Sequence, residues 1–149
     1  MDKFAGRLGL QQRVLPTYRA PFFEALSAAA TKGLGVYAGQ PRPSEAIKTT
    51  TDLKQANFHP AHNQHLFSSV FYLCRQPGFV NWLEIWQPDA LIVEANPRYP
   101  STLKAIEWMH AKGRPVLGWG LGAPPLSGLL AGVRKRSRIN LLKNLDGVI

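Results

Sequence analysis

Two arginines and a tyrosine lie close together near the start of the chain, in the segment LQQRVLPTYRAPFFEAL (residues 10–26). This pattern is typical of a buried strand, a loop with Arg13, Tyr18 and Arg19, and a helix that opens at Pro21. In an open α/β sheet, ligands bind where the carboxyl end of a strand meets the next helix. Backbone N–H groups at that helix start favour anions such as phosphate or carboxylate. The residue types and their position therefore predict a binding loop.

Two more loops with polar or aromatic side chains follow strands in the second half of the chain. The loop EANPRYPS (residues 94–101) carries Glu94, Asn96 and Arg98 between two prolines. A later loop, rich in glycine and proline, begins with Trp119, Gly120, Leu121 and Gly122. Both loops occupy the carboxyl end of a predicted strand, which is the position of the first loop as well.

A run of basic residues near the end of the sequence contains no acidic residue. Its members are Arg134, Lys135, Arg136, Arg138 and Lys143. Apolar residues between them predict a helix with one apolar face. The helix is either a solvated surface helix or a patch that contacts anionic lipid. In the second case each basic residue near the lipid surface strengthens binding by about 1 kcal/mol. A nucleic-acid contact is a third option, but no zinc-finger, RRM or KH signature accompanies the charge, so we expect no nucleic acid.

Three histidines, His59, His62 and His65, raise the question of a metal site. On a helix the first two would share a face and the third would not, and the nearest acidic residue upstream is Asp52. A zinc site needs three or four well-placed ligands. We therefore expect no metal, and we interpret this segment as a polar loop that contributes hydrogen bonds to a ligand.

The elements that must position these loops alternate along the chain. Apolar runs predict strands at residues 8–15, 35–38, 66–73, 89–94, 115–119 and 146–149. Patterns at helical spacing predict helices at residues 21–30, 79–87, 102–112 and 129–144. On the first helix, the side chains expected to face the core are Phe22, Ala25, Leu26, Ala29 and Ala30. Residues 41–64 are interpreted as an extended loop. This alternation predicts an α/β fold, a Rossmann-like parallel sheet with helices on both faces.

The composition fits one such domain. A chain of 149 residues can bury a sizeable core, and 45% hydrophobic residues with 18% charged residues exclude a disordered chain. The longest apolar runs are too short to cross a bilayer, and the N-terminus lacks the apolar centre of a secretory signal. The lone Cys74 fits a reducing cytoplasm, where we expect the protein to act. The net charge of +9 favours anionic partners.

Four short motifs occur in order along the chain: YRAPFF (residues 18–23), AG (38–39), WGLG (119–122) and, after the basic helix, LDGVI (145–149). In this order they resemble family 4 glycosyltransferases. The resemblance implies a GT-B enzyme, in which two Rossmann-like domains face each other across a catalytic cleft. It matches residues 1–149 to the N-terminal, acceptor-side domain, cut short at its C-terminal end.

The resemblance also implies how the work is divided between the two domains. The C-terminal domain holds the nucleotide-sugar donor, usually with two glutamates seven residues apart, and no such pair ends this sequence. The N-terminal domain shapes the acceptor site and the phosphate side of the cleft. We therefore expect sugar transfer by the full-length protein to a carbohydrate or lipid-linked acceptor, with no metal or other cofactor. Residues 1–149 alone are expected to be inactive. We also expect the protein to contact the inner face of an anionic membrane peripherally.

The resemblance gives the first two loops specific roles. Arg13 and Arg19 are candidates for contact with a phosphate or an acidic acceptor, and Tyr18 for a hydrogen-bonding wall. The alternative is a surface arginine, or one that ties the loop to the sheet. Glu94 and Asn96 are candidates to orient an acceptor hydroxyl, although Glu94 can equally cap the N–H groups of its own loop.

The remaining candidates lie in the second and third loops. Arg98 is a further phosphate or acceptor contact. Trp119 can stack on a sugar ring, with Gly120 and Gly122 permitting close approach, or it can belong to the core. Many family members carry a histidine in this stretch that contacts the donor sugar. The matching residue here is Leu121, which departs from the family pattern.

Two other interpretations stay open. The first is a self-contained flavodoxin-like or sugar- and anion-binding module without catalysis. It is weakened because the sequence has neither a GxGxxG after a strand nor a GxxxxGK[ST] motif. The second is a basic adaptor for nucleic acid or membrane, whose binding would depend steeply on salt.

Overall fold

Apolar runs bounded by glycine and proline form most strands of one sheet, but residues 57–60, interpreted as part of an extended loop, also form a strand, which pairs with residues 35–38. The computed structural model describes residues 2–120 and 125–149. Within these residues the main sheet has six strands in the order β3-β2-β1-β6-β7-β8, and every neighbouring pair is parallel. The strands are β1 (Leu8–Val14), β2 (Leu34–Gly39), β3 (Asn57–Pro60), β6 (Ala90–Glu94), β7 (Val116–Trp119) and β8 (Gly147–Val148). The predicted α/β fold is confirmed.

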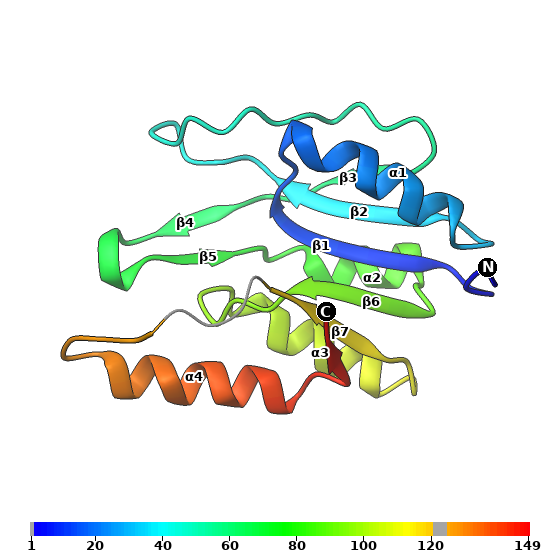
Figure 1. Cartoon of the computed structure of the whole chain (residues 1–149). Coiled ribbons are helices and arrows are strands. Elements are labelled where there is room, and N and C mark those ends of the chain that lie inside the picture. The colour runs from blue at the N-terminus through cyan, green and yellow to red at the C-terminus, as the bar shows by residue number, and fades with distance from the viewer. Residues whose placement is uncertain (1, 121–124) are drawn as a thin grey trace.

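The chain reverses its direction of travel across the sheet between β1 and β6. From β1 it moves to β2 and β3 on one side, and from β6 it moves to β7 and β8 on the other. In a doubly wound sheet this reversal leaves a crevice beyond the carboxyl ends of the two central strands. The carboxyl ends of β1 and β6 point to the left in Figure 1. Arg19, which follows β1, and Glu94, the last residue of β6, meet there.

Helices cover both faces of the sheet, as predicted. On one face α1 (Ala20–Ala28) packs the fully buried Phe23 against β1 and β2. On the other face α2 (Phe79–Trp86) and α3 (Ser101–His110) pack against β6, whose Leu91 is fully buried (Figure 1). Each such side chain contributes about 1.5–3 kcal/mol when it leaves water. The two apolar layers therefore fix the central strands whose ends carry the predicted loops.

The inward face of α1 differs from the predicted one. Phe23 and Ser27 are buried, whereas Phe22 is 54% exposed and Ala25 and Ala29 face solvent. Two neighbouring rows of residues at helical spacing run along this short helix, and periodicity does not choose between them. The turn η1 (Thr17–Arg19) leads directly into α1, and the row that starts at Phe23 is the one that meets the sheet.

The predicted strand at residues 66–73 is wrong. The chain forms an antiparallel hairpin there, from β4 (Gln64–Leu66) and β5 (Leu73–Arg75), with the short turn η2 (Ser69–Phe71) between them. Phe67 and Ser69 have φ of 58° and 52°, a left-handed conformation that ends a strand. Strand-forming side chains in this stretch therefore belong to a turn. The hairpin projects beyond the carboxyl ends of the main sheet (Figure 1).

The basic segment forms α4 (Ala131–Lys143), within the predicted helix, but it does not have the predicted apolar face. Leu141 is its one buried residue, and Val133 is 62% exposed. The helix touches the rest of the core mainly near its C-terminal end, and its other end extends to the left beside the hairpin in Figure 1. No helix in residues 2–120 and 125–149 is long and apolar enough to cross a membrane.

Candidate functional site

A network of buried amide side chains supports the carboxyl end of β1. Gln11 Nε2 donates to Gln76 Oε1 at 2.8 Å, and Gln76 Nε2 donates to the carbonyl of Gln12 at 3.1 Å and to Asn63 Oδ1 at 2.8 Å. Gln11 Oε1 accepts the backbone N–H of Glu94 at 3.2 Å, which links β1 to β6. Buried amides that are hydrogen-bonded in this way avoid the cost of an unmet polar group and fix the local geometry.

A break in the strand register places the backbone of Arg13 next to β6. The pairing of β1 with β2 shifts between Gln12 and Val14, so Arg13 is the extra residue of a bulge. Its N–H donates to Glu94 Oε2 at 2.7 Å, and its carbonyl accepts from Asn63 at 2.6 Å. The bulge thus turns the strand end toward the glutamate of the neighbouring strand.

The guanidinium of Arg13 is engaged in an ion pair. It lies 2.8 Å from Glu45 Oε2 and 3.5 Å from the hydroxyl of Tyr72, and both charged side chains are largely buried. The Arg13 charge lowers the pKa of Glu45 to about 2, with help from the N–H of Arg42. Burial lowers the pKa of Arg13, but the hydrogen bond to Glu45 and the nearby Glu45 and tyrosine groups together outweigh it, so the net pKa is raised. Arg13 therefore ties the segment that carries Glu45 to β1. The sequence interpretation placed Arg13 in the first loop, whereas it is a residue of the strand.

The guanidinium of Arg19, in contrast, faces the crevice. Arg19 Nη1 lies 3.7 Å from Glu94 Oε1 and donates a hydrogen bond to Gln12 Oε1. The guanidinium carbon of Arg19 lies 5.1 Å from the centre of the Trp119 ring. Burial raises the pKa of Glu94, against the opposing effects of the Arg13 N–H and the Arg19 charge. A carboxyl group whose pKa is raised can exchange a proton closer to neutral pH.

These groups border a crevice of about 440 Å³ beyond the ends of β1, β6 and β7. Four arginines converge on it from three segments of the chain: Arg19, Arg98, Arg134 and Arg138. Glu94 is the acidic residue that lines it among the described residues. Other walls come from Gln12, Asn96, Trp119 and Gly120. The excess of positive charge suits a ligand with a phosphate or carboxylate group.

A second cavity, of about 730 Å³, adjoins the first. Arg19 and Glu94 line both, so their ion pair forms the wall between them. Arg13, Tyr18 and Tyr99 line only the second cavity. Tyr18 is 75% exposed, and burial together with the Glu94 charge raises the pKa of Tyr99.

Trp119 serves both the core and the crevice. Its ring lies 5.5 Å from that of Phe22 and 5.8 Å from that of Phe23, which fixes its orientation. The sequence offered a sugar-stacking surface and a core residue as alternatives, and the half-buried ring is placed for both. Gly120 lines the crevice beside it, whereas Leu121 and Gly122 lie outside the described residues.

The basic residues of α4 divide into two sets. Arg134 and Arg138, one helical turn apart, are half-buried and line the crevice. Lys135, Arg136 and Lys143 are exposed and do not line it. Arg134 also donates to the carbonyl of Val70 in the hairpin at 3.1 Å. The predicted patch is therefore part crevice wall and part outer surface.

The three histidines do not come together. His59 lies in β3, with its ring 5.1 Å from that of Trp86, and burial lowers its pKa. His65 Nδ1 is 2.9 Å from the Tyr72 hydroxyl in the hairpin region, and His62 is exposed. In residues 2–120 and 125–149 there is no group of three His, Cys, Asp or Glu residues that could hold a metal ion.

The structure brings six of the predicted phosphate and acceptor contacts to the first crevice: Arg19, Glu94, Asn96, Arg98, Trp119 and Gly120. The sequence interpretation did not include Gln11, Gln12, Asn63 or Gln76 in the site. A signal for the first two was present, because adjacent glutamines are unusual in a strand that is otherwise apolar and buried. Asn63 and Gln76 are distant in sequence and gave no such signal.

Comparisons with known proteins add no family to this description. No protein-family model matches the chain, and the curated proteins gave no significant match to it. Any inference about the function of this protein therefore rests on the fold and on the geometry of the crevice.

Proposed function

We propose that this chain is the acceptor-side, Rossmann-like domain of a glycosyltransferase that resembles family 4. The observation that carries the proposal is the crevice at the strand reversal, which is lined by four arginines together with Glu94 and Trp119. Sugar transfer from a nucleotide-sugar releases a diphosphate, and cationic side chains can stabilise that charge without a metal. The site of action is proposed to be the cytoplasm, at the inner face of a membrane, with no nucleic acid partner.

The crevice residues would act together on the phosphate and the acceptor. Arg19 and Arg98 would hold an anionic group, and Trp119 would offer its ring to a sugar. Glu94 would accept a hydrogen bond from an acceptor hydroxyl, for which its raised pKa is favourable. The nucleotide would bind mostly to a second Rossmann-like domain, which the resemblance implies.

A stand-alone anion-binding module is the second candidate. It is favoured by one observation: the arginines of the crevice all come from this domain, so an anion can bind without another domain. The two candidates differ in what the gene encodes beyond the codon for Ile149. A second α/β domain with two glutamates seven residues apart supports the glycosyltransferase, and a stop codon supports the module.

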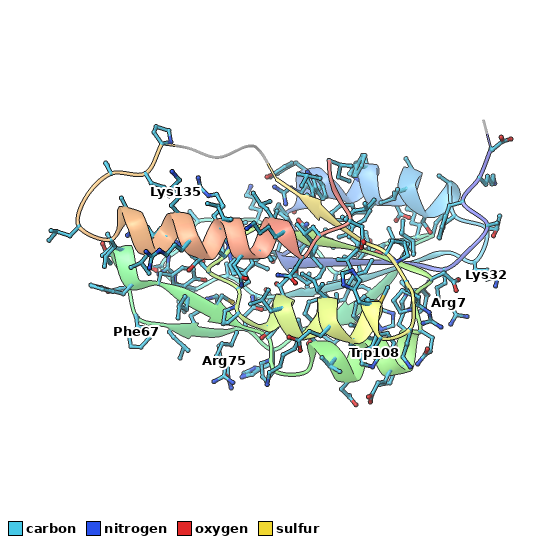
Figure 2. All side chains as sticks on the ribbon, turned by 90° about the horizontal axis from the view of Figure 1, so that it is seen from below. Arg7, Lys32, Phe67, Arg75, Trp108 and Lys135 are labelled. Atoms are coloured by element: carbon cyan, nitrogen blue, oxygen red, sulfur yellow. The ribbon has the colours of Figure 1, made fainter. Side chains whose placement is uncertain are left out.

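Binding of pyrophosphate to this chain, measured by calorimetry at fixed ionic strength, tests the crevice itself. Arg19→Gln should weaken binding at least about tenfold, since it removes a charge-assisted contact. Glu94→Gln should strengthen binding by up to about fivefold, because the carboxylate no longer competes for Arg19. Lys32→Gln makes the same charge change as Arg19→Gln at the far end of the molecule (Figure 2) and should leave binding unchanged.

Equal effects of Arg19→Gln and Lys32→Gln would mean that pyrophosphate binds through net charge alone and would remove the crevice from the proposal. The Glu94→Gln variant separates binding from transfer. In a protein that also contains the donor-binding domain, it should reduce sugar transfer while its affinity for pyrophosphate stays high.

A further inference from the structure

An apolar groove opens between the hairpin and the first turns of α4. It has a volume of about 390 Å³, within the range of pockets that hold small ligands, about 300–1,000 Å³. Its apolar walls are Phe67, Val70, Phe71, Leu130 and Val133. Figure 2 shows Phe67 on the hairpin and Lys135 on α4 at the same end of the molecule.

The groove is continuous with the arginine crevice. Pro97, Arg98 and Arg134 line both, so one wall of the groove carries the positive charge of the crevice. The bond from Arg134 to the carbonyl of Val70 joins α4 to the hairpin at this boundary. A ligand that spans the two would meet arginines at one end and hydrocarbon at the other.

The apolar side chains of the groove face solvent. Phe67 is 72% exposed, Phe71 62% and Val133 62%. Exposed apolar side chains gathered in one place mark a binding surface more often than isolated ones do. The helix that supplies Val133 also carries Lys135 and Arg136, whose exposed charges suit the anionic surface of a membrane.

We propose that crevice and groove together bind one amphiphile, with its phosphate among the arginines and its hydrocarbon chain along the hairpin. This inference rests on the proposed function and names its acceptor class: a lipid phosphate or lipid-linked sugar phosphate, and not a free carbohydrate. The charge of the crevice is complementary to the head of such a molecule, and the groove offers an apolar path for its chain. The exposed basic residues of α4 would face the membrane that holds it.

The test compares two phosphates that differ only in chain length. Decyl phosphate, below its micelle concentration, and methyl phosphate are titrated into this chain by calorimetry. Decyl phosphate should bind at least about tenfold more tightly, because its chain leaves water for the groove. Equal affinities would overturn the amphiphile inference and leave the anion crevice in place. No binding of either phosphate would overturn the crevice and the inference together.

Matched variants test whether the hydrocarbon chain of decyl phosphate lies in the groove. Val133→Asn should remove the advantage of decyl phosphate and leave methyl phosphate binding unchanged, because it adds a polar side chain to the groove without adding charge. Ile85→Asn, on α2, introduces a matching change at a side chain that is 71% exposed and outside the groove, and should keep the advantage. If both variants keep the advantage of decyl phosphate, or both lose it, the hydrocarbon chain does not lie in the groove and the inference fails.

A second pair of variants assigns the phosphate to the crevice. Arg134→Gln should weaken the binding of both phosphates by a similar factor, at least about fivefold. Arg136→Gln, on the same helix but outside the crevice and the groove, should weaken neither by more than about twofold. An effect of Arg136→Gln as large as that of Arg134→Gln would contradict a seated headgroup.

Discussion

Helices α3 and α4 serve the same sheet in opposite ways. The ten residues of α3 bury four side chains, Thr102, Ala105, Ile106 and Met109, whereas the thirteen residues of α4 bury Leu141 alone. The first helix belongs to the core. The second, with the hairpin of residues 64–75, forms what we call the rim, which lies beyond the carboxyl ends of the sheet (Figure 1). The difference shows that α4 packs on the core mainly through Leu141, near its C-terminal end, and that most of its side chains lie outside the core.

The largest expected effect sets the two helices directly against each other. Ile106→Ala, at a fully buried position of α3, should lower the free energy of unfolding by about 2–5 kcal/mol because it leaves a cavity. Ile139→Ala, at a position of α4 that is 41% exposed, should lower it by less than about 0.5 kcal/mol. Urea denaturation measures both. Similar losses would mean that α4 is part of the core.

An intermediate effect tests whether an ion pair, rather than apolar packing, holds the segment that carries Glu45. The folded-state pKa of Glu45, about 2, lies below the ordinary value of 4.5, so its ionised form stabilises the fold above pH 4.5. That contribution, about 1–3 kcal/mol, should be lost as the pH falls from 4.5 toward 2. Glu45→Gln should lower stability at pH 7 and flatten this part of the stability curve. Acid titration of both proteins in urea measures it, and an unchanged slope would count against the ion pair.

The smallest expected effect concerns the contact within the rim. Arg134→Gln removes the exposed bond to the carbonyl of Val70 and should change the free energy of unfolding by less than about 1 kcal/mol. Hydrogen exchange should nevertheless become faster in β4 and β5, because the hairpin loses its link to α4. The amides of α3 serve as the internal control. Unchanged exchange in the hairpin would mean that it is held without α4.

The sequence was sufficient for the central strands and their helices, and insufficient for the rim and for β3, which was interpreted as part of an extended loop. Apolar runs between glycine and proline located β1, β6 and β7, because buried parallel strands need such runs. The strand order could not be derived, since it depends on pairings between residues far apart. The hairpin was misread because the left-handed conformations of Phe67 and Ser69 have no marker in their residue types.

The same limit explains what became of the predicted site. Arg13 and Arg19 are alike in type and were predicted to share one loop, yet Arg13 lies in β1 and pairs with Glu45, and Arg19 lies in η1 and faces the crevice. Nothing local to the loop distinguishes them. Arg134 and Arg138 were recognised as basic but not as crevice residues, because the other residues that line the crevice are distant from them in the sequence.

The position of Trp119 gives the protein an optical reporter of its own. Of the four tryptophans, all within the described ranges, Trp82 and Trp86 lie on α2 and Trp108 on α3, while Trp119 lines the crevice under the guanidinium of Arg19. An anion that draws Arg19 away from the indole would alter the fluorescence of one tryptophan and leave three as a constant background. Occupancy of the crevice can therefore be followed in unlabelled protein, and at the speed of stopped-flow mixing.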